Sequence, residues 1–238
     1  MAVVGWEVAR KVRHCVCCLI SKRAGRPSTC STVSGARHSH PPPAVQDTRC
    51  AVWWVIRNAE KYGFDTERLV LTGRFAGGHL SLITGMLSGT AGLDNRCPES
   101  KGGNGTDRAL ASTPDLNVAA IVNWAGITDV NDLISGPNAV GYAITWLGGQ
   151  PNSEANARQV SPLTWVREDL PPILTLHGNR DQVVPYDHAV RLHEALDEAN
   201  VPNQLHTIQG REHFVDFTAE DMKTAHKVID AFLLKHLN

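Results

Sequence analysis

The chain has 238 residues, of which 42% are hydrophobic, and its formal net charge at pH 7 is -1. This length and composition suffice for one buried core, and they exclude collagen-like, disulfide-miniprotein and fully disordered classes. The near-zero net charge gives no general reason to expect binding to nucleic acid or to an anionic membrane.

Residues 1–44 differ from the rest of the chain in charge, cysteine and proline content. The first 45 residues carry seven Lys and Arg against one Glu, and five of the six cysteines lie at or before Cys50. Residues 12–21 could form one strand, but 28–43 show no apolar period, so we predict that 1–44 is loop or disorder. A targeting arm, a solvated basic tail and translation in a shifted reading frame each account for this composition.

The clustered cysteines and nearby histidines raise the question of zinc. Cys-x-Cys-Cys at 15–18 is followed by His-x-His at 38–40, without the two paired ligand knuckles typical of a tetrahedral site. We therefore predict no metal ion and no other cofactor, and we favour reduced thiols in a cytoplasmic protein. The apolar runs are too short to predict a secretion signal or a membrane span.

From residue 45 onward, apolar residues recur at the spacings of helices and strands. We predict helices over 45–63, 76–87, 138–147, 154–160, 185–200 and 219–236, and strands over 69–72, 118–124, 172–177 and 204–208. The polar, Gly-rich stretch 88–116 is predicted to be a surface loop or flap. Because strands alternate with helices, we predict an α/β fold for 45–238, with a mostly parallel sheet and right-handed crossovers.

The predicted strand at 69–72 leads directly into a turn and then into the helix at 76–87. Gly73, Ala76 and Gly77 are small residues around this turn, and they lift the side chain between them clear of the backbone. That position lies at the carboxyl end of a parallel strand, where open α/β sheets place reacting groups. The residue there is Phe75, whose benzyl group can neither attack a substrate nor transfer a proton.

Two further loops, 177–185 and 209–214, also fall at carboxyl ends of predicted strands. Asp181 in the first can orient an imidazole and stabilise its charge, and His213 in the second can act as a base. The order of elbow, Asp and His is the order of nucleophile, acid and base in α/β-hydrolases. We assign His177 to a strand end with a hydrogen bond to backbone, and His79 to packing on the elbow helix.

From about Ala44 to its end the chain resembles the α/β-hydrolases, in the small esterase and lipase branch. This branch includes acetyl-esterase-like, feruloyl-esterase-like and kynurenine-formamidase-like enzymes. The motifs that carry the resemblance are Tyr62-Gly-Phe-Asp-Thr-Glu-Arg-Leu-Val-Leu-Thr-Gly73, Gly73-Arg-Phe-Ala-Gly-Gly-His-Leu80, His177-Gly-Asn-Arg-Asp-Gln-Val-Val-Pro185, Val201-Pro-Asn-Gln204 and Gly210-Arg-Glu-His213.

The resemblance implies ester hydrolysis by a Ser-Asp-His mechanism. The family pattern at the elbow is Gly-x-Ser-Ala-Gly-Gly, so Phe75 falls on the nucleophile position and Ala76 on the residue whose N–H helps to form the oxyanion hole. Asp181 falls on the acid and His213 on the base. The implied partner is a small-molecule ester or related acyl compound, with Arg74 and Gly77 as substrate-binding positions, and no nucleic acid.

Two departures from the family pattern predict little or no turnover. Phe75 stands where serine is expected, and Ser81 and Thr72 do not occupy the raised position of the elbow. No His-Gly-Gly or Gly-Gly, which would supply the other oxyanion N–H groups, occurs before residue 77. The region where that motif belongs is the atypical N-terminal segment, so some early strands of the sheet are expected to be missing as well.

Three hypotheses for the function follow. The first is a hydrolase scaffold that keeps Asp181 and His213 but has negligible turnover. The second is a non-catalytic ligand-binding or interaction protein in which Phe75 lines the former acyl pocket. The third is an active esterase whose sequence has been altered at the N-terminus and at the elbow.

Overall fold

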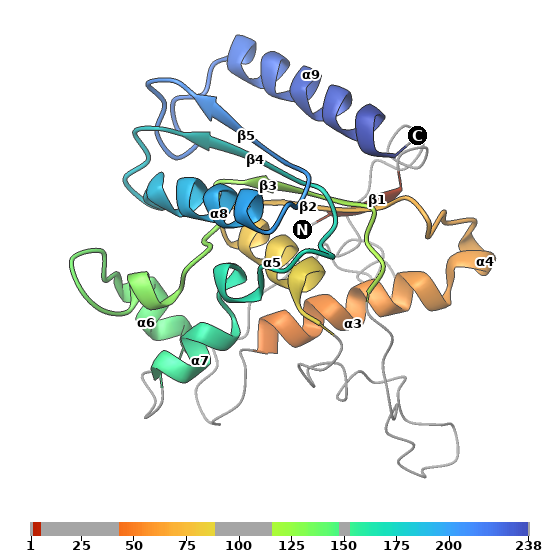
Figure 1. Cartoon of the computed structure of the whole chain (residues 1–238), viewed down its shortest axis with the longest axis horizontal. Coiled ribbons are helices and arrows are strands. Elements are labelled where there is room, and N and C mark those ends of the chain that lie inside the picture. Colours follow the sequence, from red (N-terminus) through yellow and green to blue (C-terminus); the bar gives the residue numbers. More distant parts are fainter. Residues whose placement is uncertain (1, 6–42, 89–115, 148–152, 238) are drawn as a thin grey trace, which may run out of the picture.

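A computed structural model describes residues 2–5, 43–88, 116–147 and 153–237 of the chain. In this part of the chain a central sheet lies between layers of helices (Figure 1). The possible strand at 12–21 and most of the predicted loop at 88–116 lie outside the described residues.

The sheet has five described strands, ordered as they follow in the chain: β1 (Ala2–Gly5), β2 (Leu69–Arg74), β3 (Ala120–Trp124), β4 (Ile173–Gly178) and β5 (Asn203–Ile208). Strands β2 to β5 are parallel, whereas β1 pairs antiparallel with β2. The α/β fold with a mostly parallel sheet is therefore confirmed. Because parallel strands end at one edge, the loops after β2, β4 and β5 are brought together there.

Strand β1 lies inside the N-terminal segment for which the sequence predicts loop or disorder. Its four residues pair with β2 in the register Ala2 with Thr72 to Gly5 with Leu69. So short a run has no period of its own, and it becomes a strand only because the edge of β2 offers unpaired backbone groups. For residues 2–5 the prediction is wrong.

The helices pack on both faces of the sheet. They are α3 (Pro43–Arg57), α4 (Ala59–Tyr62), α5 (Ala76–Met86), α6 (Gly141–Leu147), α7 (Ser153–Gln159), α8 (Asp187–Glu198) and α9 (Ala219–His236), with short 3₁₀ turns at η4 (Asn131–Leu133) and η5 (Pro162–Trp165). Helix α9 covers one face, and α3, α5 and α8 lie on the other (Figure 1). None of the described helices is long and apolar enough to cross a membrane.

The single helix predicted over 45–63 is divided in two. The Nδ2 group of Asn58 donates to the Trp54 carbonyl oxygen over 2.7 Å, and helix α4 restarts at Ala59. Gly63 ends α4 in the left-handed region, with φ 67°. The break follows from the asparagine, whose side chain competes with the backbone for carbonyl acceptors.

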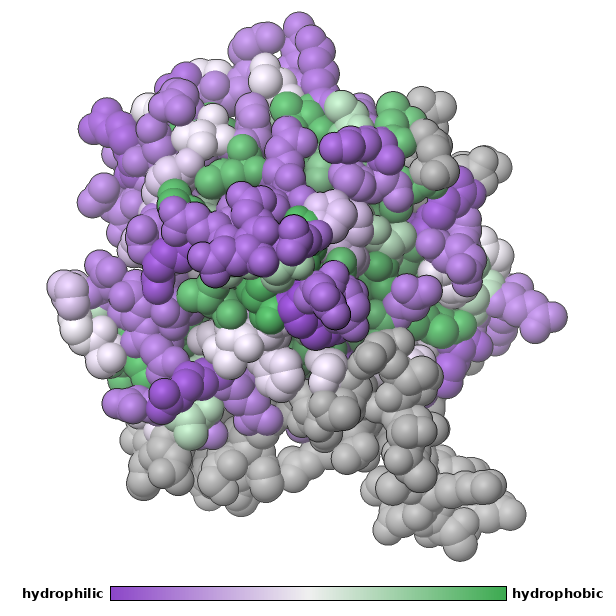
Figure 2. Space-filling view, in the orientation of Figure 1, coloured by the Kyte–Doolittle hydropathy of each residue, from purple (hydrophilic) through white to green (hydrophobic). Residues whose placement is uncertain are grey.

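Strand β3 is buried along its whole length, which explains its nearly continuous apolar sequence. Val122 and Trp124 belong to a cluster with Phe232 of α9, while Ile121 packs with Leu82 of α5 and Leu192 of α8. Successive side chains thus enter cores on opposite faces of the sheet. The outer surface in Figure 2 is largely polar and is interrupted by small apolar areas, as is usual for a folded domain.

Candidate active site

The turn between β2 and α5 forms a sharp elbow at Phe75. Phe75 has φ 51° and ψ −116°, its N–H donates to the Trp124 carbonyl oxygen over 2.9 Å, and its carbonyl oxygen accepts from the His79 N–H. A Cβ atom on Gly73 would lie 2.3 Å from the backbone C and O of Gly77. Glycine at 73 is therefore required for strand and helix to meet this closely.

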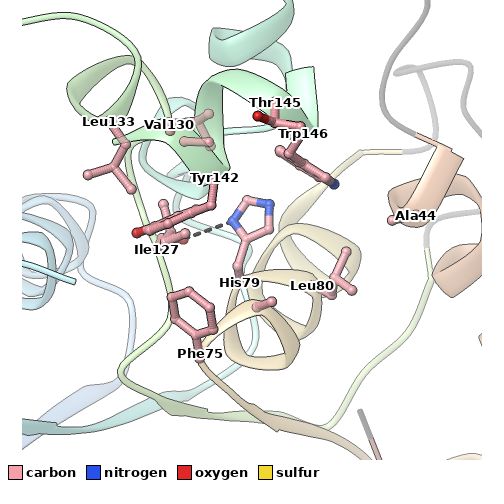
Figure 3. A pocket seen from close by; sticks show the side chains of 13 residues that line it. Ala44, Phe75, His79, Leu80, Ile127, Val130, Leu133, Tyr142, Thr145 and Trp146 are labelled. Carbon is pink, nitrogen blue, oxygen red and sulfur yellow. Dashed lines mark hydrogen bonds between the residues drawn. The ribbon is translucent and has the colours of Figure 1, made fainter. Parts of the chain in front are cut away.

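The ring of Phe75 lies between two other rings. Its centroid is 4.8 Å from that of His213, with the rings 85° apart, and 5.6 Å from that of Tyr142, with the rings 77° apart. Both contacts are edge to face, the arrangement that aromatic quadrupoles favour. Figure 3 shows the Phe75 ring directed from the elbow toward Tyr142 of α6. The raised position of the elbow thus faces His213 and is filled by hydrocarbon.

Asp181 is held by four hydrogen bonds. Its Oδ1 accepts from the backbone N–H groups of Val183 and Val184 over 2.8 and 2.9 Å, and its Oδ2 contacts His213 Nδ1 at 2.6 Å and His177 Nε2 at 3.1 Å. Burial by itself raises the pKa of Asp181, but these hydrogen bonds outweigh it and hold the pKa well below its usual range. Asp181 is therefore a carboxylate at neutral pH.

His213 reaches Asp181 because its loop closes tightly on the end of β4. The Arg180 N–H donates to the Arg211 carbonyl oxygen over 2.9 Å. A Cβ atom on Gly178 would lie 2.4 Å from that same oxygen and 2.5 Å from the Glu212 carbonyl oxygen. Since a carboxylate only accepts, Nδ1 of His213 carries a hydrogen, and Nε2 of the neutral ring is left as the acceptor.

A cavity of about 420 Å³ opens beside the elbow. Its walls include Phe75, Ala76 and His79 from the elbow and α5, and Tyr142 and Trp146 from α6 (Figure 3). His79 contacts the Ile127 carbonyl oxygen through Nδ1 at 2.9 Å, and its ring meets that of Trp146 edge to face at 5.3 Å. Burial lowers the pKa of His79 to about 4, so this wall is uncharged at neutral pH.

The other sequence-predicted residues lie in different surroundings. Ala76 is exposed, and as the first residue of α5 its N–H precedes the hydrogen-bond ladder of the helix. Arg74 and Gly77 do not line the cavity. The Arg74 guanidinium instead lies 5.0 Å from the ring centroid of Trp124 and 5.6 Å from that of Phe214.

Sequence reasoning missed two contacts of the site. His177 does bond a backbone carbonyl, that of Val184 at 3.1 Å, but it also contacts Asp181. The sequence feature that could have predicted the contact with Asp181 is the four-residue spacing from His177 to Asp181 across a Gly-containing turn. Tyr142, whose hydroxyl donates to the Val183 carbonyl oxygen over 3.1 Å, lies in a segment without any motif, so nothing in the sequence pointed to it.

The cysteines at 15–18 and the histidines at 38–40, for which we predict no metal ion, lie outside the described residues. Among the residues that the structure does describe, no group of three or more His, Cys, Asp or Glu is placed to hold a metal ion. Cys50 in α3 is disulfide-bonded, which contradicts the expectation of reduced thiols at that position.

Comparison with known proteins gives the family. Residues 34–196 match the BD-FAE family. The chain is 28% identical over 166 residues to esterase LipC of Mycobacterium tuberculosis, covering 68% of this chain and 38% of LipC. It is 29% identical over 153 residues to the probable carboxylic ester hydrolase LipM of the same organism, covering 62% of this chain and 32% of LipM. The chain therefore spans well under half the length of these relatives.

Solved structures agree with this assignment. A truncated carbohydrate esterase from gut microbiota has a TM-score of 0.59 at 25% identity, covering 80% of this chain and 68% of its own. A propionate-bound esterase of Thermogutta terrifontis has a TM-score of 0.62 at 23% identity, covering 84% and 67%, which shows the shared fold. Because the family match spans more than half of the chain, the chain belongs to the BD-FAE family of esterase-type α/β-hydrolases.

Proposed function

We propose that this chain is an esterase-type scaffold that keeps the acid and the base of acyl transfer but has lost the nucleophile. The observation that carries the proposal is the edge-to-face contact of the Phe75 ring with His213, whose Nδ1 is 2.6 Å from Asp181. Asp181 and His213 are the acid and base, and the place for an attacking oxygen is taken by a ring. Little or no ester turnover follows.

The chemistry of the site explains why the ring prevents turnover. Attack on an ester carbonyl needs an oxygen whose proton passes to His213, and Phe75 offers neither lone pair nor proton. Its ring also takes the volume beside His213 in which a water would have to stand. Without a nucleophile, the base and the oriented carboxylate cannot form an acyl-enzyme bond.

The oxyanion side of the site is incomplete as well. The Ala76 N–H stands at the start of α5, where a developing negative charge would be stabilised, but the chain has no His-Gly-Gly motif before residue 77. Loss of one oxyanion donor costs about 100- to 1,000-fold in kcat in enzymes of this type. A serine at position 75 is thus expected to restore only part of the family's activity.

The proposal is tested by hydrolysis of p-nitrophenyl acetate. We expect the parent protein to stay at the uncatalysed rate and Phe75→Ser to exceed it at least about tenfold, because the acid and base are already aligned. Phe75→Ala is the matched control for removal of the ring, and Phe75→Ser with His213→Ala is the control for the base. The proposal fails if the parent protein turns over the ester and His213→Ala abolishes that activity.

A second candidate is a ligand-binding protein on the same fold. The cavity of about 420 Å³ lies within the size range of small-molecule sites, and its walls are aromatic and aliphatic with a neutral histidine. These walls favour a small uncharged acyl compound such as a short-chain ester. A saturable heat of binding when the parent protein is titrated with a short-chain ester in a calorimeter would support this candidate. Tyr142→Ala should then weaken the affinity for that ester.

We also propose that the hydrolase-like unit comprises residues 45–238 and so begins within the first turn of α3 (Pro43–Arg57). Core contacts of α3 support this boundary, because Ala44 and Val45 belong to the same cluster as Ile83 of α5. Of the described residues before α3, Ala2–Gly5 pair with β2.

A further inference from the structure

We propose that His177 is a positioning residue for the acid and base pair: its ring holds the Oδ2 atom of Asp181 in the direction of His213. The inference rests on the proposed function, because it concerns how the remaining pair is held. It adds a second imidazole to a carboxylate that the sequence pattern assigns to one histidine.

The hydrogen on His177 can be located from its partners. Nε2 lies 3.1 Å from both Asp181 Oδ2 and the Val184 carbonyl oxygen. Both of these oxygens only accept, so Nε2 carries the hydrogen and shares it between them. Nδ1 is buried and has no hydrogen-bond partner, so the ring donates through Nε2 alone.

This donor completes the fixation of the carboxylate. The N–H groups of Val183 and Val184 both hold Oδ1, so they do not fix the position of Oδ2. His213 also donates to Oδ2, but its own position depends on that atom, so the His177 N–H is the donor that holds Oδ2 independently of His213. Because Oδ2 is also the atom that His213 contacts at 2.6 Å, any displacement of Oδ2 is transmitted to the imidazole of His213.

The ring of His177 is itself rigidly held. His177 is the next-to-last residue of β4, and its side chain is fully buried. Its ring meets the Tyr186 ring edge to face, with the centroids 5.6 Å apart. The bond to Val184 alone would satisfy a histidine that served only for packing. Because His177 also contacts Asp181 Oδ2, a change at His177 is expected to alter the position of the acid and base pair.

The test uses three variants. His177→Phe keeps a ring of similar size and removes the N–H, whereas His177→Gln keeps an N–H near the position of Nε2. His193→Phe is the matched control, because His193 is also buried but contacts Asn203 Oδ1 at the amino-terminal end of β5, the end of the sheet opposite to the pair. Circular dichroism establishes that each variant is folded.

The first readout is the proton NMR resonance of the His213 Nδ1 hydrogen in the parent protein, which needs no turnover. We expect a downfield resonance that survives in His177→Gln and His193→Phe but shifts or broadens in His177→Phe. An unchanged resonance in folded His177→Phe overturns the inference. If His177→Phe does not fold, His177→Asn, whose amide is too short to reach Oδ2, replaces it with the same two outcomes.

The second readout is kinetic and is made in the Phe75→Ser background. There we expect His177→Phe to lower kcat by about tenfold with KM little changed, since a misplaced base affects the reacting geometry. His177→Gln should recover most of that loss. Equal kcat in both variants contradicts the inference. If Phe75→Ser proves inactive, the proposed function is at fault, and the resonance of His213 still decides the role of His177.

Discussion

At the scale of single residues, Phe75 combines a strained backbone with a side chain that has no chemical use. Its φ of 51° and ψ of −116° lie in a region that side chains with a Cβ rarely adopt, at a cost of about 1 to 3 kcal/mol. In an active esterase such strain serves to present the nucleophile. Here the surrounding contacts of strand and helix maintain the strain although no nucleophile is presented.

The strain can be measured by comparing Phe75→Gly with Phe75→Ala. Both variants lose the ring, and only glycine is relaxed at this φ. We expect Phe75→Gly to be the more stable by about 1 kcal/mol in urea unfolding, the reverse of the order at an ordinary position. If alanine is equally stable or better, the elbow is not strained at Phe75.

His79 gives the protein a pH-dependent stability. Its pKa of about 4 in the folded chain lies below the ordinary value of 6.5, so the unfolded chain binds more protons between these values. The free energy of unfolding should therefore fall by about 3 kcal/mol through this group as the pH drops from 6.5 to 4.

Urea unfolding at pH 7 and pH 4.5 checks this expectation against His79→Leu. The variant should lose less stability on acidification than the parent protein. It should still lose some, because burial also lowers the pKa of His188 and His193. An equal loss in both proteins would show that His79 does not contribute.

At the scale of elements, the sequence predicts the helices and strands well where a period is long and its ends carry signals. Helix α9 begins and ends where predicted, since Thr218 and Asp221 form a capping box before a long amphipathic run. The strand Ala2–Gly5 was missed because pairing with β2, not its own composition, makes it a strand. The break at Asn58 was missed because the apolar period continues across it.

Helix α5 approaches β3 so closely that a single methyl group should disrupt the packing. A Cβ atom on Gly78 would lie 2.5 Å from Asn123 Oδ1 and 3.0 Å from the Trp124 carbonyl oxygen. We expect Gly78→Ala to lower the free energy of unfolding by about 2 kcal/mol. Gly141→Ala, where a Cβ would meet nothing within 4 Å, is the control and should change it by less than about 0.5 kcal/mol. Equal effects would contradict the close packing of α5.

At the scale of the whole molecule, the site is assembled at one edge of the parallel sheet. The sequence was sufficient to predict that the loops with Phe75, Asp181 and His213 meet there, because parallel strands place their carboxyl ends together. It could not predict the cavity, whose far wall is α6 with Tyr142 and Trp146. That wall depends on how a short helix packs, and no local pattern encodes its position.

The central claim is that the chain holds an aligned acid and base with no nucleophile, and intact mass spectrometry after incubation with a fluorophosphonate tests it most directly. Such a reagent bonds only to an activated oxygen or comparable nucleophile and requires no turnover. We expect no adduct on the parent protein, one adduct on Phe75→Ser, and none on Phe75→Ser with His213→Ala. A stoichiometric adduct on the parent protein that disappears in His213→Ala would contradict the account.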